Sequence, residues 1–183
     1  MMQQGAQEGP LAGKVVAILV EEGFHDQELD VPRQRLLDEG AQVVLVGTEA
    51  GKTYEDYRGQ KFFVTADISA QDADPGQFHG LVIPGGKAPG LMRENQAMLD
   101  LTGRLDAAGK PIAAICHGPW VVVAAEIVRR RPMTSVASIA EDLVQAGAQY
   151  RDEPVVIADN LITSRTPADL QPFCDALVEA LKS

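Results

Sequence analysis

Cys116 is the residue whose type and surroundings best fit covalent chemistry. It follows a short apolar run over residues 111–115 and precedes His117-Gly118-Pro119, after which a second apolar segment begins at Trp120. The first run has the length of a buried strand and the second that of a helix. A cysteine at such a junction resembles a nucleophile elbow, in which a tight turn lifts the side chain to the carboxyl edge of a sheet. Cysteines are more often packing residues, but this context favours a reactive thiol.

Gly85 and Gly86 follow another apolar run, over residues 80–84. Glycines let backbone N–H groups approach a ligand closely, which an oxyanion hole requires. Because ligands of doubly wound sheets lie outside the carboxyl ends of the strands, this turn and Cys116 are expected to lie together. The N–H of the residue after a nucleophile commonly completes such a hole, so His117 is expected to contribute its backbone. A plain tight turn remains the alternative interpretation of the two glycines.

The histidines limit the kind of hydrolase that the chain can be. There are three, His25, His79 and His117, and none follows residue 117. This excludes a cysteine hydrolase whose base follows the nucleophile in the chain, and it excludes the late histidine of glutamine amidotransferases. His79 precedes a predicted strand and is expected at its amino end, away from the site. The ring of His117 need not face the neighbouring thiol.

Carboxylates after the first strand are the remaining candidates for proton transfer. Glu28 can project from the first turn of the following helix towards the sheet edge where Cys116 is expected. The pattern alone favours a solvated glutamate at this position. A helix N-terminus behind Cys116 would favour its thiolate form. A thiol paired with a carboxylic acid, without a third histidine, suits addition to a small carbonyl better than peptide hydrolysis.

The elements that must position these residues alternate along the chain. Near-continuous apolar runs, typical of strands covered on both faces, occupy residues 14–20, 41–47, 80–84 and 111–115. Helical patterns follow them, one ending at Gly40, one over residues 92–108 and one running from Trp120 towards Arg129. Residues 49–79 are harder to interpret and suggest short strands. The alternation predicts an α/β doubly wound sandwich with a mostly parallel central sheet.

The last third of the chain predicts two more helices and a strand pair. The spacing of Ser138 and Glu141 fits a capping box that opens a helix. Residues 155–157 and 161–163 fit paired strands around the turn dipeptide Asp159-Asn160. Cys174 lies on the apolar stripe of the final helix, which favours a packing role.

Length and composition narrow the possible partners and compartment. We expect a single domain over residues 14–183, preceded by a flexible tail over residues 1–13. A net charge of −10 argues against nucleic acid, and the basic run over residues 129–131 is interpreted as a solvated helix end. The two cysteines lack metal-ligand spacing, so no disulfide, metal or other cofactor is expected. No segment fits a signal peptide or membrane span, which predicts a cytoplasmic protein without a membrane partner.

Four stretches together resemble the DJ-1/PfpI superfamily, closest to its PfpI-like intracellular protease/amidase branch: GLVIPGGKAPG, KPIAAICHGPW, SIAEDLVQAGA and NLITSRTPADLQPF. The resemblance runs from about Lys14 to Leu181, and Ala-Ile-Cys-His-Gly-Pro is its most specific part. It implies a flavodoxin-like fold and homodimers, with hexamers in some members. It also implies glyoxalase or deglycase chemistry on methylglyoxal-type carbonyls, peptidase activity, or stress-linked oxidation of the cysteine.

The resemblance also implies roles for individual residues. Cys116 matches the reactive nucleophile, Glu28 in DQELDVP matches the acid that hydrogen-bonds the sulfur, and His117 matches the histidine that follows the cysteine. Gly85 and Gly86 match the oxyanion turn.

Three departures from the family pattern weaken the peptidase interpretation or alter the site. Gly90 in Ala88-Pro89-Gly90 stands where protease-type hexamers carry an acid that orients the histidine of a neighbouring subunit. Val136 replaces a tyrosine common in PfpI-like members, and His25 stands where relatives often carry an acid.

The leading hypothesis is a cytoplasmic stress-response protein that acts through Cys116 on small dicarbonyls or glycated adducts. Such an enzyme would be a glyoxalase- or deglycase-like hydrolase or lyase. One alternative is a cysteine peptidase of PfpI type. Another is a non-catalytic sensor or chaperone, in which Cys116 is oxidised to sulfenic or sulfinic acid.

Overall fold

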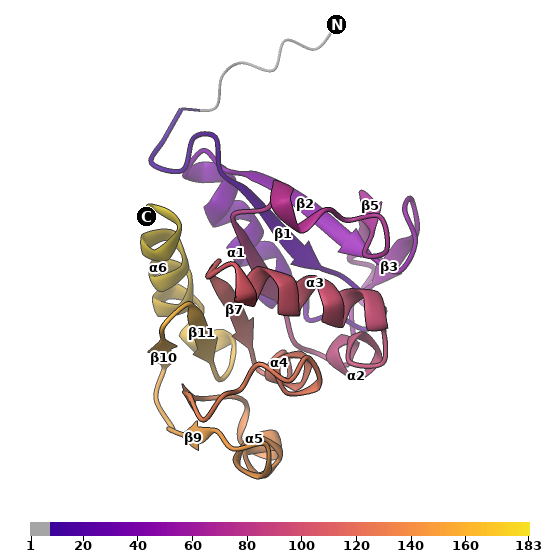
Figure 1. The fold of residues 1–183 in the computed structure, drawn as a ribbon. Coiled ribbons are helices and arrows are strands. Elements are labelled where there is room, and N and C mark those ends of the chain that lie inside the picture. Colours follow the sequence, from indigo (N-terminus) through magenta and orange to yellow (C-terminus); the bar gives the residue numbers. More distant parts are fainter. Residues whose placement is uncertain (1–7) are drawn as a thin grey trace, which may run out of the picture.

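A seven-stranded sheet forms the centre of the molecule in a computed structural model, which describes residues 8–183 (Figure 1). Six strands run parallel, and β10 pairs antiparallel with β11 at one edge. The predicted mostly parallel sheet is confirmed. In spatial order the strands are β10 (Val155–Ala158), β11 (Leu161–Ser164), β7 (Ile112–Ile115), β6 (Gly80–Ile83), β1 (Val15–Leu19), β2 (Gln42–Gly47) and β5 (Ile68–Ser69).

Helices cover both faces of this sheet, which gives the predicted doubly wound sandwich (Figure 1). α1 (Asp26–Asp38) and α6 (Leu170–Leu181) contact each other on one face, whereas α3 (Gln96–Ala107) packs with α4 (Pro119–Ala124) on the other. A short helix, α2 (Ala88–Met92), also contacts α4. Beyond α4 lie α5 (Ala140–Gln145) and the small sheet of β8 (Pro132–Met133) and β9 (Gln149–Tyr150). β3 (Thr53–Glu55) and β4 (Phe63–Thr65) form a separate hairpin.

The strand order creates the place for a site. β1 lies between β2 and β6, with Ile18 opposite Leu45 on one side and Val82 on the other. The chain therefore leaves β1 towards one side of the sheet and later returns to its other side, which makes a topological switch point. Because β6 and β7 are parallel neighbours, their carboxyl ends bring the Gly85 turn and Cys116 to this same edge.

Two predicted helices are shorter than their sequence patterns suggested. The pattern over residues 92–108 is divided, since Met92 ends α2 and α3 begins only at Gln96. Asn95 causes the new start, because its side chain accepts the Met98 N–H over 3.2 Å as an N-cap. The helix after the elbow ends at Ala124 rather than near Arg129, and a turn with Glu126 at a φ of 60° follows.

The capping box predicted for Ser138 and Glu141 is wrong. The segment Ala137–Ile139 forms a 3₁₀ turn, and α5 begins at Ala140 without a side-chain cap among the described residues. The turn is attached to the elbow instead, since the Val136 N–H donates to the Cys116 carbonyl over 3.1 Å.

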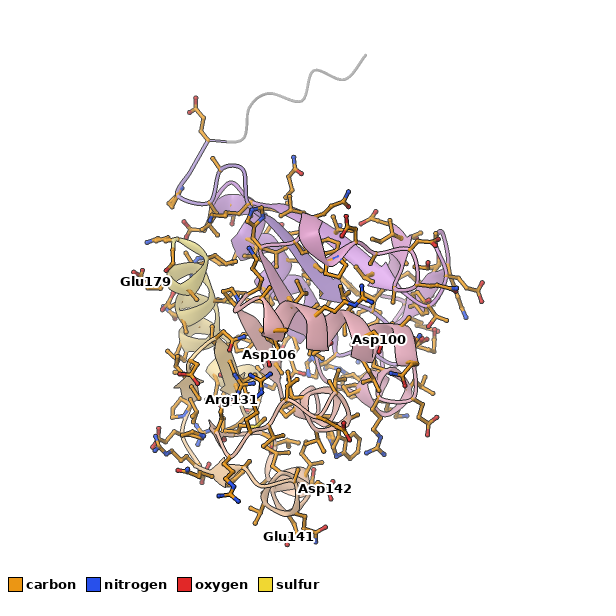
Figure 2. The ribbon with its side chains drawn as sticks, viewed as in Figure 1. Asp100, Asp106, Arg131, Glu141, Asp142 and Glu179 are labelled. Atoms are coloured by element: carbon orange, nitrogen blue, oxygen red, sulfur yellow. The ribbon has the colours of Figure 1, made fainter. Side chains whose placement is uncertain are left out.

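The interpretation of residues 129–131 as a solvated helix end holds only in part, because Arg129 and Arg130 are exposed but the helix ends earlier and Arg131 is not solvated. Arg131 is buried, and its guanidinium donates to Asp106 over 3.0 Å and to Asn160 over 2.8 Å. Arg129 pairs with the second oxygen of Asp106 over 2.8 Å. Figure 2 shows Arg131 beside Asp106, which comes from α3. These contacts of the two arginines with Asp106 and Asn160 hold α3, the turn after α4 and the β10–β11 turn together.

The expected flexible tail covers residues 1–13, of which residues 1–7 lie outside the described part. Leu11 differs from this expectation, because it is fully buried and its N–H donates to the Glu39 carbonyl over 2.9 Å. Cys174 is buried in the core as predicted. The single domain over residues 14–183 stays a prediction. Across residues 8–183, none of the helices combines the length and apolar character needed to cross a bilayer.

Candidate active site

Cys116 occupies a strained turn between β7 and α4. Its φ is 62°, which is a left-handed backbone conformation that residues other than glycine rarely adopt. Two backbone hydrogen bonds hold it, from its own N–H to the Ser164 carbonyl and from the Val136 N–H to its carbonyl, both over 3.1 Å. A Cβ on Gly118 would lie 2.5 Å from the Ile83 carbonyl oxygen, so only glycine lets α4 begin this close to the sheet. The predicted strand–turn–helix elbow is therefore present.

The turn after β6 brings Gly85 between Cys116 and Glu28. A Cβ on Gly85 would lie 2.5 Å from Glu28 Oε1 and 2.7 Å from Cys116 Cβ. The Gly85 N–H donates to Glu28 Oε1 over 3.1 Å, and the Gly85 carbonyl accepts the His25 N–H over 3.0 Å. Gly86 has a φ of 84°, and its N–H donates to the Cys116 sulfur. This turn thus contacts both reactive side chains through its backbone. The Gly85 N–H is engaged by Glu28 and is not available to an oxyanion, and the oxyanion role expected of Gly86 stays a prediction.

Glu28 lies in the first turn of α1 and is fully buried rather than solvated. Burial raises the pKa of its carboxyl to about 8, and the nearby Asp26 charge acts in the same direction, while the Gly85 N–H opposes them. The carboxyl is therefore mostly protonated at neutral pH. Oε2 accepts no hydrogen bond from the other described residues, and the Cys116 thiol lies close enough to interact with the carboxyl.

Burial also raises the pKa of the Cys116 thiol, to about 12, and the negative charge of an ionised Glu28 contributes to this rise. The backbone N–H groups of Gly86 and His117 donate to the sulfur and act in the opposite direction. Because protonation of Glu28 removes its charge, the two groups titrate as a pair. Above about pH 8 the pair has lost one proton, which can be taken from either the thiol or the carboxyl. In one of these two forms the sulfur is a thiolate beside a carboxylic acid.

The ring of His117 faces the thiol, an orientation that the sequence left open. Nδ1 lies 3.4 Å from Cys116 Sγ, and Nε2 lies 3.5 Å from the Ser138 hydroxyl oxygen. The ring also packs against Trp120, with centroids 5.0 Å apart. Burial lowers the pKa of His117, so the imidazole is neutral at pH 7. Ser138 and Trp120 are the site neighbours that sequence reasoning did not assign.

The sequence matches the DJ-1/PfpI family over residues 14–180. The chain belongs to the DJ-1/PfpI family. It is similar to "Protein/nucleic acid deglycase 2" of Escherichia coli, with 37% identity over 161 residues that cover 87% of this chain and 93% of that protein. It is equally similar, at 37% over 169 residues, to "Putative cysteine protease YraA" of Bacillus subtilis, with 92% and 99% of the two chains covered.

A solved structure supports the same relationship at the level of the fold. A two-domain protein from Anabaena variabilis, with a DJ-1/ThiJ/PfpI-like and a ferritin-like domain, superposes with a TM-score of 0.90 and 38% identity. The match covers 92% of this chain and 48% of that one, so this chain spans about half the length of the two-domain protein.

Gly90 and His25, two of the departures from the DJ-1/PfpI pattern, both lie near the site. Gly90 lies in α2, where a Cβ would be 3.9 Å from the Trp120 ring, so position 90 faces the neighbour of His117 without supplying a carboxylate. His25 is the N-cap residue of α1. Its Nδ1 lies 3.3 Å from an Asp26 oxygen and its ring packs on Tyr57 at 4.9 Å, while burial lowers its pKa.

His79 lies far from this site, as predicted. Its Nδ1 accepts the Val15 N–H over 3.0 Å at the amino ends of β1 and β6. The structure thus brings together all five residues predicted for the site, and it leaves His79 and Cys174 outside it: Cys116, Glu28, His117, Gly85 and Gly86.

Proposed function

We propose that this protein is a cysteine-dependent enzyme that acts on small dicarbonyls such as methylglyoxal, or on the adducts that they form with biological amines and thiols. The main support for this proposal is the pairing of a buried thiol with a buried, protonated carboxyl. The backbone N–H groups of Gly86 and His117 point towards the sulfur of this pair. The deglycase name of the Escherichia coli relative supports the same substrate class.

The pair provides each group that addition to an aldehyde needs. The Cys116 thiolate forms a bond to the aldehyde carbon, and the π electrons of the carbonyl move to its oxygen, which the N–H groups of Gly86 and His117 can approach. The Glu28 carboxylic acid gives its proton to that oxygen, which leaves a hemithioacetal and a carboxylate. The reactive sulfur and its proton donor therefore begin and end this step without a net change in charge.

The carboxylate that remains can act as a base in the next step. Glu28 removes the proton from the carbon that carries sulfur, and the electrons shift to the adjacent carbonyl oxygen to give an enediolate. The hydroxyl proton then moves from the first oxygen to the second. Glu28 returns its proton to the adjacent carbon while the carbon that carries sulfur becomes a carbonyl. The product is a thioester of lactate on Cys116. Water then cleaves the C–S bond, which releases lactate and restores the thiol.

Peptide hydrolysis receives less support from this geometry. A cysteine peptidase requires an imidazole that is oriented by an acceptor, usually a carboxylate or an amide. Here Nε2 of His117 faces the Ser138 hydroxyl, and position 90 is glycine. A cysteine sulfur beside a carboxylic acid that can donate its proton favours carbonyl addition instead.

The test is lactate formation from methylglyoxal by the reduced protein without glutathione. We expect turnover in the native protein and none in Cys116→Ala or Glu28→Gln, whereas Cys174→Ala, at the other buried cysteine, retains activity. Absence of turnover with every aldehyde and glycated amine tested would overturn the proposal. Cleavage of unfolded protein would then indicate a peptidase, and a peroxide-dependent mass gain on Cys116 without turnover would indicate a sensor.

We also propose that the protein works as a cytoplasmic homodimer in the response to carbonyl stress. The DJ-1/PfpI resemblance, which implies homodimers, supports self-association. Two cysteines without metal-ligand spacing suit a reducing compartment, and the net charge of −10 disfavours nucleic acid as a partner. A monomeric mass in light scattering at micromolar concentration would overturn the dimer.

A further inference from the structure

The ring of His117 links the Cys116 sulfur to a side chain at the molecular surface. Nδ1 lies 3.4 Å from Sγ, and Nε2 lies 3.5 Å from the Ser138 oxygen. Ser138 is exposed to solvent, whereas Glu28 is fully buried. The imidazole and the hydroxyl therefore form a continuous route by which protons can pass between the thiol–carboxyl pair and the surface.

We propose that Ser138 is a positioning residue that holds the imidazole of His117 so that both of its neutral tautomers are available to Cys116. This inference rests on the proposed function, because it assigns a proton route to the same thiol. A carboxylate in this position could only accept a hydrogen bond, which would fix the proton on Nε2. A hydroxyl both donates and accepts, and it therefore supports either tautomer.

Each tautomer has a different use at the sulfur. When the Ser138 hydroxyl donates to Nε2, the proton lies on Nδ1 and its N–H donates to the thiolate. When Nε2–H donates to the Ser138 oxygen, Nδ1 can accept the thiol proton. Proton release then runs from Sγ to Nδ1, from Nε2 to the Ser138 oxygen, and from the Ser138 hydroxyl to water. One proton leaves the site, and the imidazole stays neutral throughout.

The local structure holds Ser138 at this distance from the ring. The turn that carries it is attached to the elbow through the Val136 N–H and the Cys116 carbonyl, 3.1 Å apart. The Tyr150 hydroxyl adds a second attachment by donating to the Ser135 carbonyl over 3.1 Å. The side chain of Ser138 does not cap α5, so its hydroxyl is free for the imidazole.

A second contact keeps the ring from turning away. His117 packs against Trp120, whose indole N–H donates to Asp142 over 2.8 Å and whose ring lies 4.0 Å beneath the Arg93 guanidinium. Figure 2 shows Asp142 on α5, beyond α4. Asp142 and Arg93 thus act on Trp120 rather than on the imidazole. Within the described residues, Cys116 is the one titratable group at hydrogen-bond distance from the His117 nitrogens.

The test compares Ser138→Ala, Ser138→Thr and Ser138→Asp by ¹⁵N NMR of the His117 ring and by the pH profile of Cys116 alkylation with iodoacetamide. We expect averaged nitrogen shifts from two tautomers in the native protein and in Ser138→Thr. Ser138→Ala and Ser138→Asp should each show the single Nε2–H tautomer. Alkylation in Ser138→Ala should slow by about threefold, as expected for the loss of one positioned hydrogen bond, and Ser138→Thr should restore it.

Two results would overturn the inference. One is an unchanged tautomer ratio in Ser138→Ala, and the other is a Ser138→Thr variant that behaves like Ser138→Ala. Thr65→Ala, which removes a hydroxyl from β4, is the control and should match the native protein. Neither readout requires substrate, so the inference can fail while lactate formation stands, and it can hold if lactate formation fails.

Discussion

The Gly85 N–H donates to Oε1 of the fully buried Glu28 over 3.1 Å. An oxygen that accepts this hydrogen bond is poorly suited to carry the acidic proton. In the protonated carboxyl the proton therefore lies on Oε2, the oxygen to which none of residues 8–183 donates a hydrogen bond. The backbone of the glycine turn thus selects which oxygen of Glu28 exchanges a proton with the neighbouring thiol.

Gly85→Ala is expected to abolish most activity and to destabilise the fold by about 1–3 kcal/mol. Its Cβ would lie 2.5 Å from Glu28 Oε1 and 2.7 Å from Cys116 Cβ, so at least one of these groups must move. Gly103→Ala is the matched control, because its Cβ meets nothing within 4 Å in the middle of α3. That variant should gain about 0.5–1 kcal/mol and keep full activity. Thermal unfolding and lactate assays compare the two, and equal effects would contradict the steric explanation.

Alkylation of Cys116 is expected to accelerate as pH rises through about 8, the pKa of Glu28. Below this pH the thiol and carboxyl both keep their protons, and above it the pair has lost one and can form thiolate. In Glu28→Gln this rise near pH 8 should disappear, because no carboxyl titrates beside the thiol and burial still holds the thiol pKa above this range. Mass spectrometry separates Cys116 from the buried Cys174. A Glu28→Gln protein whose alkylation rate still rises near pH 8 would exclude the pairing.

The same carboxyl should make stability depend on pH. Its pKa is raised from about 4.5 to about 8 by burial, so between these values the folded chain holds a proton that the unfolded chain has lost. The free energy of unfolding contributed by Glu28 is complete below pH 4.5 and is lost as pH rises through 8.

Glu28→Gln, which cannot ionise, should match the native protein at pH 4.5 and exceed it at pH 9 by on the order of 3 kcal/mol. Denaturant unfolding at the two pH values measures the difference. Glu94→Gln, an exposed glutamate, is the control and should shift stability equally at both. A constant difference for Glu28→Gln would contradict the burial of a titrating carboxyl.

Arg131→Met is expected to lower the free energy of unfolding by about 3–5 kcal/mol, because it leaves the Asp106 carboxylate buried without its main partner. Arg130→Met changes the exposed neighbour, and its effect should stay within about 0.5 kcal/mol. Urea unfolding of both variants gives the comparison. Similar losses would indicate that the arginine run acts through overall charge rather than through this ion pair.

The sequence predicted the sheet and the central residues of the site because their signals are local. A buried strand followed by a Gly-Gly turn, or by a cysteine, indicates residues at the carboxyl edge, as Gly85 and Cys116 illustrate. Glu28 was placed at that edge by the same reasoning, but its complete burial depends on α1 packing against the glycine turn, which no local pattern reports.

Other features depended on contacts between distant segments and could not be predicted. Ser138 has the spacing of a helix cap, and only the hydrogen bond between Val136 and Cys116 brings its turn to the site. Arg131 lies in a basic run that is typical of surfaces, yet it is buried in an ion pair with Asp106 from α3. Local charge patterns cannot reveal a partner that is 25 residues away in the chain.

Trp120 gives this protein a built-in optical probe of its own site. It is the sole tryptophan of the chain, and its ring centroid lies 5.0 Å from that of His117. A protonated imidazole quenches indole emission more strongly than a neutral one. The intrinsic fluorescence of Trp120 should therefore decrease on acidification. The midpoint of this decrease should lie below the ordinary histidine pKa, because burial lowers the pKa of His117. Replacing His117 with Asn should leave the emission steady across the same range.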